Sequence, residues 1–84
     1  MIEAKEERRR EVRRRTFKSA RIVFNSRQST IDCIVRNLSE HGALLVVPTS
    51  LGVPKEFELW FDDVTHLARV VWRAGDRMGV TWSQ

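Results

Sequence analysis

The sequence has few of the residues that build disulfides, metal sites and phosphate-binding loops. Its 84 residues include one cysteine, two histidines and four scattered glycines. The single cysteine, Cys33, has no partner for an internal disulfide, and one cysteine with two histidines at irregular spacing does not predict a zinc site. Scattered glycines do not form a glycine-rich phosphate loop. We therefore expect no metal site and no bound cofactor.

Long apolar runs are also missing. The longest one is ALLVVP, residues 43–48, whereas a membrane-spanning helix needs about 20 apolar residues. The first residues, MIEAKEE, and the arginines that follow them do not have the pattern of a secretory signal. We therefore expect no membrane span, and the single cysteine favours the cytoplasm as the compartment.

Candidate catalytic groups are few. Ser39 and His41 lie two positions apart in a predicted turn, and no carboxylate is clearly placed behind the histidine. This does not match the nucleophile and base of a hydrolase. Cys33 falls on the apolar face of a predicted strand, which favours a position in the core over a reactive one. We expect the protein not to be an enzyme.

Arginine is concentrated near the N-terminus. Residues 6–15 read EERRREVRRR, which is six arginines in ten positions. Residues 1–18 carry a net charge of +4, which equals the formal net charge of the whole chain, so residues 19–84 are neutral. Proteins that bind long nucleic acids usually spread basic residues over a face of the fold. The neutral body makes a nucleic-acid partner unlikely and favours a smaller anion.

Residues 19–84 show the period of β-strands. In TIDCIVRNL, residues 30–38, Ile31, Cys33 and Val35 share one face, and EFELWF alternates in the same way. Six such segments are separated by turn residues: 19–24, 30–38, 42–47, 56–61, 66–74 and 78–82. This pattern predicts an all-β fold, a small six-stranded antiparallel β-barrel. We expect a flexible basic arm (1–18), the barrel (19–84) and no C-terminal helix.

Two motifs occur in order along the chain. The arm contains RxxxR at Arg9 and Arg13, preceded by Arg8, and a second register is open at Arg10 and Arg14. The turn NLSEHG, residues 37–42, matches [D/N]xSxxG. Together with HLARVVW and MGVTW near the end, these motifs resemble the PilZ domain family, bacterial receptors for cyclic di-GMP.

The resemblance implies a cyclic di-GMP site made from the arm, the turn and a late strand. Guanidinium groups suit phosphates and the O6 and N7 acceptors of guanine, and amide and hydroxyl groups suit its N1 and N2 edge. Gly42 would either admit the ligand to the backbone or adopt a positive φ, and Trp72 would stack on a guanine. The implied ligand-binding residues are Arg8, Arg9, Arg13, Asn37, Ser39, Gly42 and Trp72.

The concentration of positive charge in the arm, taken together with this ligand, predicts a mechanism. Cyclic di-GMP would order the arginine arm over the barrel and so change contacts with an unidentified downstream protein. The extra Arg8 suits a stacked pair of ligands, which brings four phosphate charges to one arm.

Other interpretations of the same residues stay open. The arginine run can be a solvated tail, NLSEHG a plain strand connection, and the tryptophans packing residues of the barrel. The whole domain can be a PilZ-like protein adaptor that binds no nucleotide, or a small nucleic-acid-binding barrel.

Overall fold

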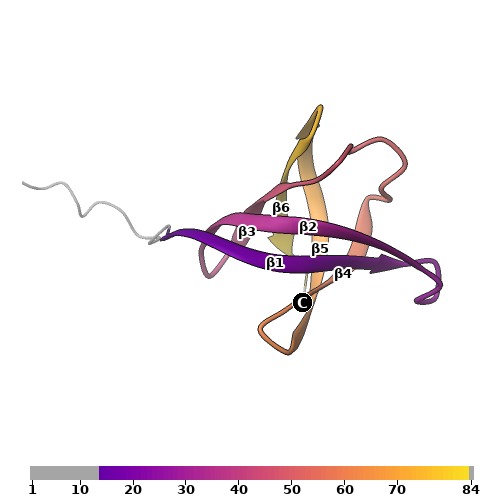
Figure 1. Ribbon diagram of the computed structural model, residues 1–84, viewed down its shortest axis with the longest axis horizontal. Helices are drawn as coiled ribbons and strands as arrows, with labels where there is room; N and C mark the ends of the chain where they lie inside the picture. The colour runs from indigo at the N-terminus through magenta and orange to yellow at the C-terminus, as the bar shows by residue number, and fades with distance from the viewer. Residues whose placement is uncertain (1–13, 84) are drawn as a thin grey trace, which may run out of the picture.

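A computed structural model describes residues 14–83, and six β-strands form the regular structure of that range. They close into an antiparallel barrel in the order β1-β2-β3-β6-β5-β4 (Figure 1). The described residues contain no helix, and therefore none that could span a membrane. The predicted six-stranded antiparallel barrel is confirmed. The strands are β1 (Arg14–Phe24), β2 (Ser29–Leu38), β3 (Gly42–Val46), β4 (Glu56–Phe61), β5 (Val64–Ala74) and β6 (Arg77–Trp82).

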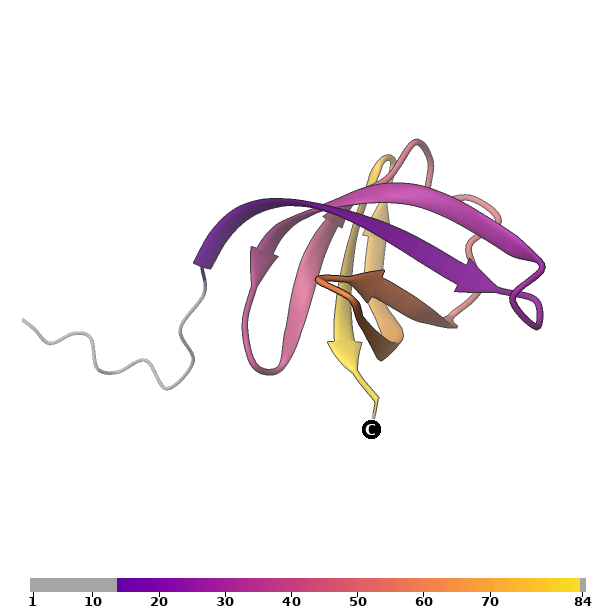
Figure 2. The same cartoon turned by 60° about the horizontal axis from the view of Figure 1, so that its bottom comes forward.

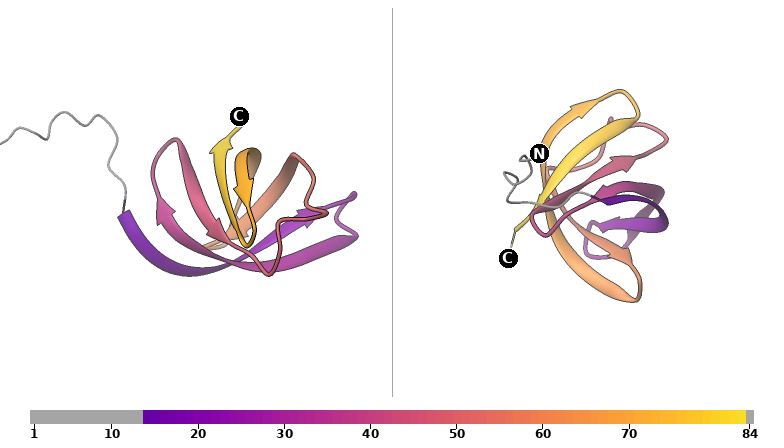
Figure 3. Two further views of the ribbon diagram at one scale, coloured as in Figure 1. Left: turned by 90° about the horizontal axis from the view of Figure 1, so that it is seen from above. Right: turned by 90° about the vertical axis from the view of Figure 1, so that its left-hand side faces the viewer.

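Two pairings between strands distant in sequence close the barrel. β3 pairs with β6 along its whole length, from Gly42 opposite Thr81 to Val46 opposite Arg77. β1 pairs with β4 through three residue pairs, Arg21 to Val23 on one side. A view along the long axis shows the strands arranged around a common centre (Figure 3).

The core is built from alternate strand residues, as the sequence period predicts. Ile22, Val35, Leu45, Leu59 and Met78 are its largest fully buried side chains. Cys33 is also buried, and burial raises the pKa of its thiol to about 12. The thiol is therefore protonated at neutral pH, in agreement with the predicted core position.

β1 begins five residues earlier than the apolar pattern indicates. The sequence predicts its start at Ser19, whereas Arg14 already pairs with Leu38 and Arg15 with Asn37. Pairing with β2 extends the strand here, although RRTFK has no apolar alternation of its own. The first residues of β1 therefore belong to the sheet, while residues 1–13 of the predicted arm lie outside the described range. Figure 2 shows β1 and β2 as one long curved hairpin.

Side-chain contacts hold this early part of β1 in place. Lys18 Nζ lies 2.8 Å from Asp62 Oδ2 in the turn between β4 and β5. The guanidinium of Arg36 lies over the ring of Phe17, 4.7 Å from its centroid. A bulge separates the two paired stretches of β1, between Arg15 and Lys18.

The loop between β3 and β4, residues 47–55, is fastened to the turn between β5 and β6. Arg73 Nη1 donates to the carbonyl oxygens of Ser50 and Val53, at 2.7 and 2.8 Å. Ser50 is buried, and its Oγ donates to the carbonyl oxygen of Gly75 at 2.7 Å. The loop is thus fixed at the barrel end away from the NLSEHG turn (Figure 2).

Candidate functional site

Ser39 closes the turn between β2 and β3. Its backbone N–H donates to the carbonyl oxygen of Gly42 at 2.9 Å. Its Oγ accepts from the backbone N–H groups of His41 and Gly42, at 3.2 and 3.3 Å, and donates to the Gly42 carbonyl at 3.4 Å. The hydroxyl therefore bonds to backbone groups on the far side of the turn and holds the turn closed.

The same turn is bonded to the end of β6. The carbonyl oxygen of His41 accepts from the backbone N–H of Trp82 at 3.0 Å and from Thr81 Oγ1 at 2.9 Å. The carbonyl oxygen of Ser39 accepts from Trp82 Nε1 at 3.3 Å. These bonds fix the position of the turn relative to β6.

Gly42 is required by a close approach between strands. A Cβ at this position would overlap the carbonyl oxygen of Val80 and lie 3.0 Å from its carbonyl carbon and 3.1 Å from Thr81 Cα. The alternative that Gly42 adopts a positive φ is wrong, because the glycines with positive φ are Gly52 and Gly75. The residue thus lets the β3 backbone lie against β6.

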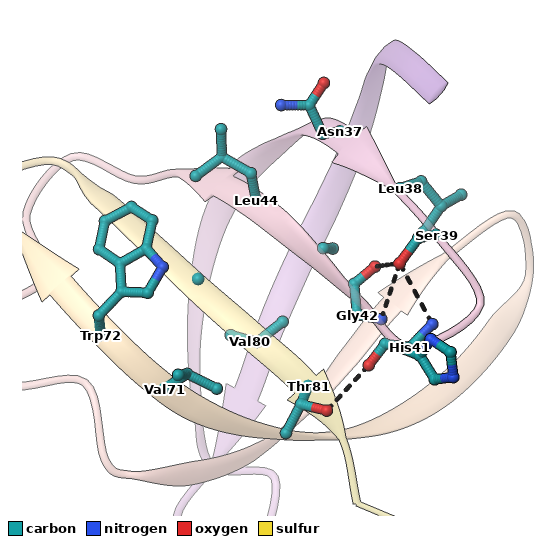
Figure 4. Close-up of a pocket in the computed structure, with 12 residues that line it drawn as sticks. Asn37, Leu38, Ser39, His41, Gly42, Leu44, Val71, Trp72, Val80 and Thr81 are labelled. Atoms are coloured by element: carbon teal, nitrogen blue, oxygen red, sulfur yellow. Dashed lines mark hydrogen bonds between the residues drawn. The ribbon is translucent and has the colours of Figure 1, made fainter. Parts of the chain in front are cut away.

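A pocket lies on the outside of the barrel between this turn and β5. Figure 4 shows Trp72 at one end, the Ser39 turn at the other, and Leu44 and Val80 between them. Its volume is about 310 Å³. The polar groups are concentrated at the turn, and the apolar surface lies toward β5. The lining residues are Asn37, Leu38, Ser39, His41, Gly42, Ala43, Leu44, Val71, Trp72, Gly79, Val80 and Thr81.

A second hollow, of about 960 Å³, lies beside the same turn. It shares Ser39 and His41 with the pocket and is also lined by Arg14 and Glu40. Arg14 comes to this place because β1 pairs with β2 up to Leu38. An arginine of the N-terminal run therefore stands next to the NLSEHG turn.

Aromatic rings rather than metal ligands form one wall of this hollow. The ring of His66 stacks on Phe61 with centroids 4.5 Å apart and lies 4.9 Å from the ring of Trp82. Within residues 14–83, no group of three or more histidine, cysteine, aspartate or glutamate side chains is placed to hold a metal ion.

The structure brings four of the seven predicted site residues into one pocket: Asn37, Ser39, Gly42 and Trp72. The other three, Arg8, Arg9 and Arg13, lie outside the described residues. Sequence reasoning did not assign Leu44, Val71 or Gly79 to the site. The late-strand pattern contains Gly79, but its place beneath Trp72 follows from the pairing of β5 with β6.

A comparison with protein families gives a match over most of this chain. The family model of the PilZ domain matches residues 7–84, which covers the arginine run, the turn and all six strands. No curated protein matches the chain. Since the match extends over most of the sequence, the chain belongs to the PilZ domain family, a family of binding and adaptor domains.

Proposed function

We propose that this protein is a cyclic di-GMP receptor module of bacterial second-messenger signalling. The observation that carries the proposal is the pocket that combines Asn37, the Ser39 turn and Trp72, next to a strand that brings Arg14 to the same turn. Family membership supports the same ligand class.

The pocket suits one guanine of the ligand. At about 310 Å³, it falls at the small end of the range of about 300–1,000 Å³ for small-molecule sites. The indole of Trp72 offers an apolar face for stacking, and the Asn37 amide offers hydrogen bonds to the guanine edge. The rest of the dinucleotide would extend along the turn into the hollow beside Arg14.

The arginines would meet the phosphates and the second guanine. A guanidinium group forms two parallel hydrogen bonds with a phosphate or with guanine O6 and N7. We assign Arg9 and Arg13 to these contacts, with Arg8 available for a stacked pair of ligands. Arg14 is the competing candidate, because it lines the hollow at the turn.

Ser39 contributes mainly by holding the turn. A hydroxyl has one donor and two acceptor positions, and Ser39 Oγ already donates to the Gly42 carbonyl and accepts from two amides. Its effect on the ligand is therefore indirect, through the position of the turn.

One calorimetric titration tests the function. The full chain should bind cyclic di-GMP, and the stoichiometry would distinguish one ligand per chain from a stacked pair. GMP and a short oligonucleotide should bind much more weakly. Binding of the oligonucleotide alone would point to the nucleic-acid alternative, and binding of none of them would overturn the proposal.

A PilZ-type protein adaptor without nucleotide is the second candidate. It is favoured by the structural use of the turn, because Ser39 closes the β2–β3 connection and Gly42 permits the β3–β6 contact without any ligand. Such an adaptor should show no binding in the cyclic di-GMP titration although its barrel is folded.

Asn37→Ala and Ser39→Ala should differ in their effects. Both should weaken cyclic di-GMP binding. Only Ser39→Ala should also lower the melting temperature, because it removes hydrogen bonds worth about 1 kcal/mol each, whereas the Asn37 amide bonds to no other described residue.

Ser50→Ala is the matched control. It removes a hydrogen bond from a serine to the carbonyl oxygen of Gly75, far from the pocket, so stability should fall and affinity should not. A Ser39→Ala variant that binds like the parent would limit the turn to folding.

Ligand binding is proposed to order the arginine arm across the turn. The arm has many like charges and little apolar surface. The two phosphates of the ligand would offset the repulsion between its arginines, which opposes ordering of the arm in the free protein. Amide hydrogen exchange measures this directly. Saturating cyclic di-GMP should slow exchange in residues 8–13 far more than in residues 43–47 of the barrel, while GMP should not. Unchanged exchange in the arm, at saturation, would refute the ordering step.

A further inference from the structure

A bulge in β5 turns Trp72 out of the barrel. Ala68 and Val70 point into the core, and strict alternation would send Trp72 after them. The pairing with β6 shifts at this point, from Val70 opposite Val80 to Trp72 opposite Gly79. The extra residue, Val71, reverses the alternation, so Trp72 is 46% exposed and lines the outer pocket.

The indole of Trp72 then lies on the backbone of Gly79. A Cβ at Gly79 would overlap Trp72 Nε1 and lie 2.6 Å from Cε2 and 2.8 Å from Cδ1. These three atoms belong to the five-membered ring. Gly79 is itself buried, and the indole lies directly over it.

The conformational freedom of glycine does not explain this residue. Gly79 does not have a positive φ, and glycine within a strand weakens the strand in comparison with alanine. The close approach of the indole is the structural reason for a glycine at this position. Any side chain would push the ring away from the sheet.

We propose that Gly79 is a positioning residue of the ligand site: the missing side chain seats the Trp72 indole against β6 and leaves its opposite face open to the pocket. The inference rests on the proposed function, because it assigns that open face to a guanine. A guanine stacks best on an aromatic ring that is held in one place. The contact with the Gly79 backbone holds the ring without a hydrogen bond.

Gly79→Ala is the direct test, with Trp72→Ala and the double variant beside it. Trp72→Ala should weaken cyclic di-GMP binding about 5- to 100-fold. Gly79→Ala should weaken it at least about fivefold, because the methyl displaces an exposed side chain that can swing outward. The double variant should bind no more weakly than Trp72→Ala. Parent-like binding by Gly79→Ala, or an equal loss in both backgrounds, would overturn the proposal.

An NMR measurement tests the contact between Trp72 and Gly79 separately from the binding of cyclic di-GMP. In the ligand-free protein, Gly79→Ala should move the indole N–H resonance of Trp72, while those of Trp60 and Trp82 stay in place. If the Trp72 resonance shifts but the parent protein does not bind cyclic di-GMP, the proposed function is refuted and the Trp72–Gly79 contact is supported. An unchanged resonance would refute the contact. If Gly79→Ala unfolds, the double variant should refold, and failure to do so would show that the backbone and not the indole requires glycine.

Discussion

Gly42→Val is expected to unfold the barrel or to lower its free energy of unfolding by about 3 kcal/mol or more. The added Cβ would overlap the carbonyl oxygen of Val80 and crowd Thr81 Cα. These are backbone atoms of β6, so they cannot turn aside as a flexible side chain can. The strands β3 and β6 must separate, and the pocket that both of them line is lost. Circular dichroism with thermal and urea unfolding measures the loss.

Gly52→Ala is the matched control for this variant. Gly52 has a φ of 84°, and apart from its chain neighbours no atom lies within 4 Å of a Cβ placed there, so alanine at this position meets only the conformational penalty, about 1 kcal/mol. A Gly42→Val protein that melts near the Gly52→Ala temperature would contradict the close-approach explanation. A folded Gly42→Val protein with reduced affinity would instead support a contact between ligand and backbone.

Arg9→Ala and Arg13→Ala are each expected to weaken cyclic di-GMP binding about 10- to 100-fold, since a hydrogen bond to a charged group contributes about 1.5–3 kcal/mol. The melting temperature should hardly change, because we expect these charged side chains to lie in water and not in the apolar core. Titrations at two salt concentrations should show the loss more clearly at low salt.

The same series decides the register of the arm. Arg10→Ala and Arg14→Ala should have small effects if Arg9 and Arg13 hold the ligand, and large ones if the place of Arg14 beside the turn is decisive. Arg69→Ala is the control, because Arg69 pairs with Glu56 and lines neither hollow at the turn. Normal binding by all four arm variants would remove the arm from the site.

Alternation made the fold predictable, and its interruptions mark where prediction failed. Phe57, Leu59 and Phe61 point inward as their spacing indicates. The sequence did not predict that β1 begins at Arg14, because residues 14–18 are held by cross-strand pairing and by the Lys18–Asp62 ion pair. Neither contact has a signature in the local sequence.

The site was predictable to the extent that motifs contain it. NLSEHG identified the turn, but the reason for Gly42 lies in β6, which is distant in sequence. The bulge that turns Trp72 outward has no signal in HLARVVWRA, since Ala68 and Val70 would place it inside. Whether these residues bind cyclic di-GMP stays a prediction.

The strand order has a consequence for folding. β1-β2-β3 and β4-β5-β6 are each made by local hairpins, whereas the β1–β4 and β3–β6 contacts join residues more than 30 positions apart. Such long-range closure is slow and comes at an entropic cost. The first half supplies the pocket wall from Asn37 to Leu44, and the second supplies the wall from Val71 to Thr81. The pocket therefore comes into being when the halves dock, and a ligand bound there opposes their separation.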